Sequence, residues 1–474
     1  MQEKLLIKQK YLKDKTLQKT STEVDVFCYL TTPFCFYKYN GKNITKMKKI
    51  KKPELLSPIQ DYTSLTAAIS NGADAVFFGI QGFNMRAGAK NFTVKDLPKI
   101  TKIAHKNNVK TYLAINIIIY QEEIKKVEQV LKKVKLAKVD AIICWDFAII
   151  EIAKRLGIEV HISTQASISN SETAEFYRKL GVTRVVLARE CSLEQIKEIK
   201  KHTKAEIEIF IHGAMCVSVS GRCFMSQFLY GKSANRGECM QPCRRKYLIK
   251  QIDGGKELEL GEDYVLSPKD MCTMEFLEKI LELDVDCFKI EGRNRSPEYV
   301  ATVTRAYRTA IDFYYDSKKH DKKFKVEFDN LKSELMEKLG TVYHRGESAG
   351  FFLGKPIDEW TRSYGSQATQ KKEYIGKVIK FYKKIEVAEI LIQGNIKLKI
   401  GDSIIFQGPT TGSVEEKVLS LEINHEQVKS VGRGQKVAIK INSVIREHDE
   451  AYIIKKALPK CESDCNGCKG CPAA

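Results

Sequence analysis

Hydrophobic and polar positions change their period along the chain, and from Glu54 onward short apolar runs alternate with segments of helical period. Short runs rich in Val, Ile and Phe, bounded by Gly, Asn or Asp, are typical of buried strands. The strands predicted in this way are Glu54–Leu56, Ala75–Phe78, Lys110–Ile115, Ala141–Cys144, Glu159–Ser163, Arg184–Leu187, Glu206–Ile211 and Asp286–Ile290.

Amphipathic helices are predicted between these strands, several of them opened by Ser, Thr or Asp. Alternating strands and helices indicate parallel strands joined by crossover helices. The number of strands and their spacing are typical of an α/β fold of the (β/α)8, TIM-like barrel type. A doubly wound open sheet has the same alternation and remains the alternative. The predicted helices include Leu65–Asn71, Val94–Asn108, Ile124–Lys138, Ser171–Leu180, Leu193–Lys201 and, after the last strand, Glu298–Tyr315.

The connection between the seventh and eighth strands, Ile211 to Asp286, is several times longer than an ordinary βα loop. In a barrel it lies on the catalytic face, so anything that it carries borders the substrate pocket. After about Tyr374 the pattern becomes strands alone, which predicts a small β-barrel. Its predicted strands are Ile375–Phe381, Ile385–Ile392, Ile396–Lys399, Ser403–Phe406, Glu415–Ile423 and Lys436–Ile441.

These patterns divide the chain into five expected parts. They are a basic N-terminal extension (1–50), a barrel with an inserted cysteine cluster (51–330), a linker with helices (331–373), the small β-barrel (374–455) and a cysteine-rich tail (456–474).

Composition and charge indicate a globular protein with an anionic partner but do not identify its activity. The chain has 474 residues, 43% hydrophobic and 29% charged, which are ordinary values for a globular protein. Its net charge of +20 favours a polyanionic partner such as RNA. No uncharged apolar run is long enough to cross a membrane, so no membrane partner is expected.

Eight of the 14 cysteines fall into two clusters, which favours metal binding in a reducing, cytoplasmic setting over disulfides. Each cluster offers four thiols, the number that a zinc site or an iron–sulfur cluster needs. The tail spacing is close to a ferredoxin run, which favours a four-iron four-sulfur cluster over zinc, and such a centre could pass electrons to the first one. The clusters are Cys216, Cys223, Cys239 and Cys243, and Cys461, Cys465, Cys468 and Cys471.

Three segments around the first cluster resemble the signature of the collagenase-like peptidase family U32. They are Glu208–Cys216, Ser220–Ser226 and Asn235–Tyr247, and the likeness continues through Leu266–Cys272 and Phe288–Arg293. Besides peptidases, this family includes hydroxylases of transfer RNA and ribosomal RNA, and the chain looks most like the branch that hydroxylates the wobble uridine of transfer RNA.

The resemblance implies that Cys216, Cys223, Cys239 and Cys243 hold a four-iron four-sulfur cluster, with Cys272 as a substitute ligand or a thiol of the pocket. It also implies prephenate as a possible co-substrate, RNA as the partner and an electron donor. A collagenase-like peptidase is the alternative function. The sequence has no motif of a metallopeptidase or serine hydrolase, and only His212 and Cys216 could form a Cys–His pair.

Polar residues at the predicted strand ends are the candidate catalytic groups. Lys289 and Arg293 could bind a carboxylate with Glu291 orienting them, although a buried ion-pair network explains the same residues equally well. Gln165 and His212 could contact a base or move a proton, and both also suit purely structural roles.

Overall fold

The structure is a computed structural model that describes residues 24–26, 37–40, 43–46, 51–248, 264–317 and 323–457. The chain forms two units, Met1–Lys51 and Lys52–Ala474. In the first unit, strands β1 (Val24–Val26), β2 (Tyr37–Asn40) and β3 (Asn43–Lys46) pair in antiparallel order.

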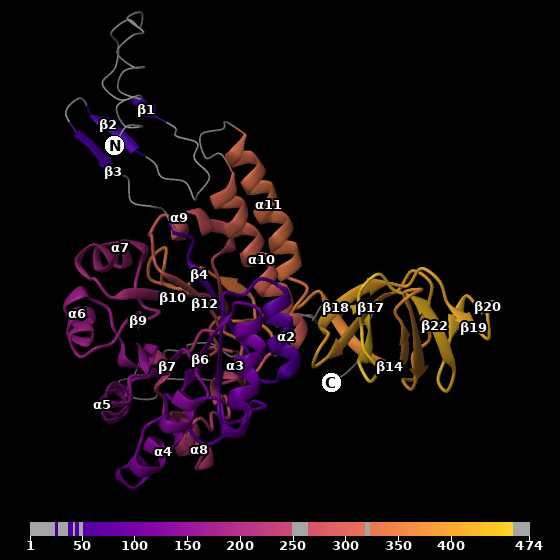
Figure 1. Ribbon diagram of the computed structural model, residues 1–474, viewed down its shortest axis with the longest axis horizontal. Coiled ribbons are helices and arrows are strands. Elements are labelled where there is room, and N and C mark those ends of the chain that lie inside the picture. The colour runs from indigo at the N-terminus through magenta and orange to yellow at the C-terminus, as the bar shows by residue number, and fades with distance from the viewer. Residues whose placement is uncertain are drawn as a thin grey trace, which may run out of the picture. The chain divides into compact units, whose positions relative to one another are not determined.

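The second unit contains a closed parallel barrel, which confirms the predicted fold class (Figure 1). The last strand pairs with both the first and the seventh, so the sheet closes on itself and the open-sheet alternative is wrong. The barrel strands are β4 (Glu54–Pro58), β5 (Ala75–Gly79), β6 (Lys110–Ala114), β7 (Ala141–Cys144), β8 (Glu159–Ile162), β9 (Arg184–Val186), β10 (Glu206–Gly213) and β12 (Cys287–Ile290).

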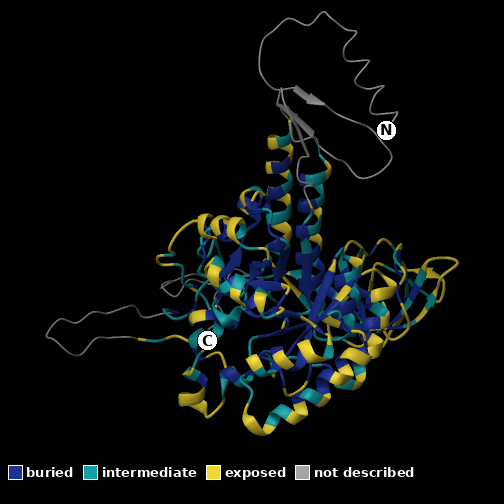
Figure 2. Cartoon of the chain, turned by 60° about the vertical axis from the view of Figure 1, so that its left-hand side comes forward, coloured by how far each residue is buried: buried dark blue, intermediate teal, exposed yellow. Residues whose placement is uncertain are grey.

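Helices cover the outside of the barrel with their apolar faces turned inward (Figures 1 and 2). α4, for example, buries Val127, Val130, Leu131 and Val134 and leaves its lysines in solvent. The α-helices are α2 (Tyr62–Ser70), α3 (Leu97–Lys106), α4 (Ile124–Leu136), α5 (Phe147–Leu156), α6 (Ser171–Lys179), α7 (Leu193–His202), α8 (Met225–Tyr230), α9 (Leu277–Leu281), α10 (Pro297–Asp316) and α11 (Phe324–Leu339).

The start of α2 and the position of α11 differ from the prediction. α2 begins at Tyr62 because the Asp61 carboxylate caps it, accepting a hydrogen bond from the Ser64 backbone N–H at 2.8 Å. The domain boundary expected at residue 330 falls inside α11, which packs on α10. Phe313 stacks on Phe324 and Phe328 with ring centroids 5.9 and 5.7 Å apart, so α11 belongs to the barrel's outer layer.

The long connection after β10 carries short elements that the sequence pattern did not predict. β11 (Asp270–Cys272) runs antiparallel to the end of β10, with His212 opposite Cys272, and β13 (Glu347–Ser348) pairs with β11. This pairing brings the two ends of the cysteine-bearing segment together. Single 3-10 turns occur at Val94–Asp96, Gln121–Glu123, Thr164–Ala166, Val219–Gly221, Ala234–Arg236, Pro242–Arg244 and Met274–Phe276.

The C-terminal part is an antiparallel β domain with its own apolar core, as the pattern indicated. Reading Glu415–Ile423 as one strand was wrong, because Val418 and Leu421 both turn into the core and break the alternation. The strands are β14 (Gln370–Tyr382), β15 (Val387–Ile392), β16 (Leu398–Lys399), β17 (Ser403–Gly408), β18 (Gly412–Lys417), β19 (Glu422–Ile423), β20 (Glu426–Gln427), β21 (Ser430–Val431), β22 (Lys436–Lys440) and, not predicted, β23 (Glu450–Lys456).

Candidate functional site

A cavity of about 380 Å³ opens at the carboxyl ends of the barrel strands, the usual place of the active site in this fold. Most of the residues singled out from the sequence line it. They are Gln165, Cys216, Cys223, Cys239, Cys243, Lys289, Glu291 and Arg293.

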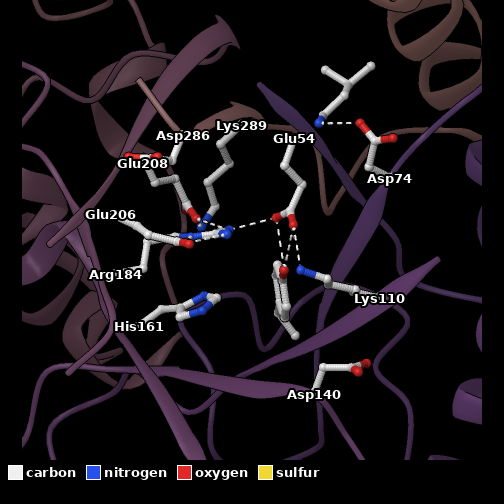
Figure 3. A network of polar contacts seen from close by, with 12 residues as sticks. Glu54, Asp74, Lys110, Asp140, His161, Arg184, Glu206, Glu208, Asp286 and Lys289 are labelled. Carbon is white, nitrogen blue, oxygen red and sulfur yellow. Dashed lines mark hydrogen bonds and ion pairs between the residues drawn. The ribbon is translucent and has the colours of Figure 1, made fainter. Parts of the chain in front are cut away.

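Lys289 forms the floor of the cavity and is part of a buried ion-pair network inside the barrel (Figure 3). Its Nζ lies 2.7 Å from Oε1 of Glu208, a carboxylate without exposed surface, and Arg184 approaches the other oxygen at 3.5 Å. Arg184 also binds Glu54 at 2.6 Å. Burial alone would raise the pKa of Glu208, but Lys289 and Arg184 outweigh it and lower that pKa. Lys289 therefore offsets the negative charge of Glu208 inside the barrel.

Glu291 directly follows strand β12, lines the cavity and is surrounded by cations. Arg86 approaches its Oε1 at 3.2 Å and Arg189 its Oε2 at 3.7 Å. Burial would raise the pKa of this carboxyl, but Arg86, Arg189 and Arg293 hold the pKa at about 2. Glu291 is thus a permanent anion that holds two guanidinium groups in place.

Arg244, Arg293 and Arg295 are the cations of the cavity that form no salt bridge within the part of the chain that the structure describes, and of these Arg293 and Arg295 follow the last barrel strand. Arg293 is buried, and Nη1 donates to Oδ1 of Asn84 at 3.2 Å. Burial and the neighbouring Arg86 lower its pKa to about 10, so it is still charged at neutral pH. Arg295 stacks on Tyr343, with its guanidinium carbon 3.5 Å from the ring centroid. Both can accept an anionic group from a ligand.

The four loop cysteines, Cys216, Cys223, Cys239 and Cys243, face this same cavity from four points of one segment. Among the described residues no three His, Cys, Asp or Glu side chains are close enough to bind a single metal ion. A lone zinc would need sulfurs roughly 3.8 Å apart, given Zn–S bonds of about 2.3 Å. Four thiols that line one cavity match the number of ligands that a four-iron cluster takes from a protein.

Electrostatics around the thiols agree with a negatively charged centre. Burial raises the pKa of Cys243, Arg244 lowers it, and the other three thiols raise it, as expected for four sulfurs in mutual range. The Arg244 side chain is fixed by the Pro268 carbonyl at 2.9 Å and by the Met215 carbonyl. Cations beside the thiols would offset the charge of a thiolate-bound cluster.

Gln165 is held at the cavity wall by neighbouring polar groups. Its Oε1 accepts hydrogen bonds from the Ser163 hydroxyl and, at 3.4 Å, from Nδ2 of Asn116. It comes from the turn after β8, and Asn116 follows β6, so the two amides meet at the same end of the barrel.

The structure does not bring His212 to the cavity. A bulge between Phe210 and His212 breaks the alternation of β10, so Phe210 lines the cavity while the imidazole packs against Tyr307 of α10 at 5.6 Å. Burial lowers its pKa to about 4, and it is neutral at physiological pH. Cys272 also lies outside the cavity lining, in the core, with Sγ 3.7 Å from Sδ of Met336. Cys461, Cys465, Cys468 and Cys471 lie outside the described residues.

Comparison with known proteins identifies the family. The family model described as peptidase family U32 matches residues 60–362, which contain the barrel strands from β5 to β12, the cysteine loop and all the cavity residues named above. The chain belongs to peptidase family U32.

Relatives of this U32 protein carry names of two kinds. An uncharacterised protease of Methanocaldococcus jannaschii is 43% identical over 85% of this chain and 99% of its own length. A collagenase of Porphyromonas gingivalis is 41% identical over 85% of this chain and 98% of its own. The tRNA hydroxylation protein P1 of Bacillus subtilis is 37% identical over 78% of this chain and 86% of its own.

Several residues of the U32 site had little or no signal in the sequence. Arg86 and Asn116 are single polar residues after β5 and β6, without a motif around them. Arg295 likewise stands alone. Only their positions just beyond barrel strands could have pointed to them, because residues there face the catalytic end. Separately, within the residues that the structure describes, no helix has the length and apolarity required to span a membrane.

Proposed function

We propose that this U32 chain is an iron–sulfur-dependent RNA hydroxylase that forms 5-hydroxyuridine at the wobble position of transfer RNA in the cytoplasm. The observation that carries the proposal is the convergence of four thiols and two guanidinium groups that form no salt bridge among the described residues, those of Arg293 and Arg295, in one cavity at the catalytic end of the barrel. The relative named as a tRNA hydroxylation protein supports this choice of substrate.

Replacing the C5 hydrogen of uracil by a hydroxyl group from an oxygen donor at the oxidation level of water releases two protons and two electrons. The site therefore needs a redox centre that passes these two electrons to an acceptor. Cys216, Cys223, Cys239 and Cys243 would hold a four-iron four-sulfur cluster, which supplies electron transfer when bound. Arg244 would offset its charge. The rest of the cavity then serves to bind and orient the reactants.

The co-substrate in this proposal is a small carboxylate, for which prephenate is the candidate. Arg293 and Arg295 would bind its carboxylates, because neither guanidinium forms a salt bridge among the described side chains. Glu291 holds Arg86 and Arg189 at the wall and prevents them from competing for the same anion. Lys289, paired with Glu208, stays in the floor.

Two measurements on one set of variants test the function. Protein purified without air should contain about four iron atoms per loop cluster and absorb visible light. A strain lacking the gene should lose 5-hydroxyuridine from its transfer RNA, as measured by nucleoside mass spectrometry. Wild type and a Cys191→Ala control should restore it and Cys216→Ser should not. Unchanged 5-hydroxyuridine in the deletion strain would refute the proposal.

The tail cysteines are proposed to hold a second iron–sulfur cluster, which would exchange electrons with a donor protein and with the loop cluster. Zinc is the alternative occupant and would have a structural role, because it has no redox chemistry. Removing residues 458–474 should lower the metal content by that of one site while the loop cluster remains. An unchanged metal content would show that the tail holds none.

Peptidase activity is the second candidate, because two relatives are named protease and collagenase. The structure offers no Cys–His pair for it, since His212 faces α10 and makes no hydrogen bond to Cys216 in the described part of the chain. Gelatin cleavage by pure protein that persists in Cys216→Ala would favour the peptidase, and its absence would exclude this substrate.

A further inference from the structure

A second cavity, of about 420 Å³, adjoins the first on the catalytic face. The two share the lining residues Met85, Asn116, Gln165 and Val219, so a group bound in the second cavity can reach into the first. The second cavity differs from the first in its walls, because neither a lysine nor an acidic residue lines it.

Aromatic side chains form part of these walls. Trp145 follows β7, and its ring is fixed because Nε1 donates to the Asn116 carbonyl at 3.1 Å. Phe224, on the cysteine loop, is 63% exposed although it lines the cavity. The Arg222 guanidinium lies 5.9 Å from the Trp145 ring centroid. Exposed aromatic rings with a neighbouring guanidinium are the usual surface for stacking a nucleobase.

Hydrogen bonds fix the orientation of the side-chain amides of Asn116 and Gln165 in this cavity. The Met85 backbone N–H donates to Oδ1 of Asn116 at 3.2 Å, so Nδ2 of Asn116 must point the other way. That Nδ2 donates to Oε1 of Gln165. The Nε2 amino group of Gln165 donates no hydrogen bond to any residue whose position the structure describes. Gln165 is only 6% exposed, yet it lines both cavities.

Asn235, on the cysteine loop, also has a side-chain oxygen that accepts a hydrogen bond from a backbone N–H. Its Oδ1 accepts the Cys223 backbone N–H at 3.1 Å, which fixes Nδ2 on the opposite side. Nδ2 has no acceptor in the described ranges of the chain, and the residue is 6% exposed. Neither amino group is among the fully buried polar atoms that lack a partner, so both reach the open space of the cavity. Two amides of fixed orientation thus each offer a donor to a ligand there, and a ligand with two acceptors can engage both.

We propose that this second cavity is the pocket for an unpaired uracil of the RNA substrate, with Trp145 and Phe224 stacking the base and the amino groups of Gln165 and Asn235 donating to its carbonyl oxygens. The inference rests on the proposed RNA hydroxylase function and names the residues that select the base. Uracil presents two carbonyl acceptors on its edge. Cytosine replaces one of them with an amino donor, which would face another donor.

The position of Cys223 connects this pocket with the proposed chemistry. Cys223 lies between Arg222 and Phe224 in the chain and lines the first cavity, while both neighbours line the second. A base between Trp145 and Phe224 therefore lies next to the cysteine loop. Chemistry on a base requires that it leave its stack and enter such a pocket.

Binding measurements on the anaerobically purified full chain test the pocket without turnover. The probes are two labelled single-stranded RNA heptamers of adenosine with one central uridine or cytidine, followed by anisotropy. The chain has two tryptophans, so a Trp360→Phe background makes Trp145 the only fluorescent indole. The uridine RNA should bind about tenfold more tightly than the cytidine RNA and should quench Trp145.

Isosteric substitutions then test the two donors. Asn235→Asp and Gln165→Glu keep the oxygen that accepts the internal hydrogen bond and replace only the amino group, so each should abolish the preference for uridine. Trp145→Ala should weaken binding of both RNAs about tenfold, while Trp145→Phe retains it. The controls are Asn330→Asp at an exposed position of α11 and Phe176→Ala at an exposed position of α6. Neither substitution should change the affinity for either RNA.

The outcomes separate this inference from the proposed function. Equal affinity for the two RNAs, an unquenched Trp145, or normal preference in both isosteric variants would overturn the pocket, even if deletion of the gene abolishes 5-hydroxyuridine. Conversely, a uridine preference that depends on Asn235 and Gln165 would establish the pocket, even if transfer RNA keeps its 5-hydroxyuridine and the hydroxylase proposal fails.

Discussion

Replacing Lys289 with methionine separates its structural role from a catalytic one. Its Nζ lies 2.7 Å from the Glu208 carboxylate, and at an effective dielectric constant of about 20 this contact corresponds to at most about 6 kcal/mol. The desolvation of both groups offsets much of that energy. Removing one partner of a buried pair typically costs about 3–5 kcal/mol. Because Arg184 still faces Glu208 at 3.5 Å, we expect Lys289→Met to lower the free energy of unfolding by about 3 kcal/mol.

Urea unfolding followed by circular dichroism measures this effect. The matched control is Lys201→Met, which removes an exposed pair with Glu198 and should cost less than about 1 kcal/mol. The double variant Lys289→Met/Glu208→Gln should lose less than the sum of its single variants, since both remove the same interaction. If Lys289→Met lowers the free energy of unfolding no more than the control does, the ion pair between Lys289 and Glu208 does not stabilise the barrel.

Three further predictions follow from the site. Because the pKa of Glu291 is lowered to about 2, its charge stabilises the fold above the unfolded pKa of about 4.3, and this contribution is lost as pH falls toward 2. The difference in unfolding free energy between wild type and Glu291→Gln should therefore shrink over that range, and a constant difference would contradict the assignment. The pKa of His212 is lowered to about 4, so the neutral ring favours the fold and stability falls as pH drops from about 6.5 to 4. His212→Gln should reduce this acid sensitivity, as urea titrations at several pH values can measure. Finally, Cys272→Ser should keep the iron content of wild type whereas Cys243→Ser loses it, and iron loss in Cys272→Ser would make Cys272 a ligand after all.

The sequence predicts the barrel well because its signal is local. Runs such as Ala141–Cys144 are apolar on both faces, as strands buried between helices and barrel interior must be. The closure of the barrel depends on pairing between β12 and β4, far apart in the chain, which no local pattern shows. β11 was missed for a related reason, since a strand of three residues has almost no period of its own.

The candidate site was predictable where residues share a motif and not where they act singly. The spacing of the loop cysteines pointed to one site, and all four face one cavity. The orientation of His212 could not be predicted, because a two-residue period places it beside Glu208 and Phe210, and only the bulge turns it away. Trp145 and Asn235 acquire their roles through neighbours such as Asn116 and Cys223, which are visible only in three dimensions.

The pairing of β11 with the end of β10 has a consequence for the lifetime of the enzyme. It joins both ends of the cysteine segment with backbone hydrogen bonds, so the entropy of closing that loop is lost when the barrel folds and not when metal arrives. Under the proposed function, loss of iron to oxygen would leave the barrel folded and the thiols still close together at its catalytic end. Such a protein would take up iron again without unfolding or new synthesis.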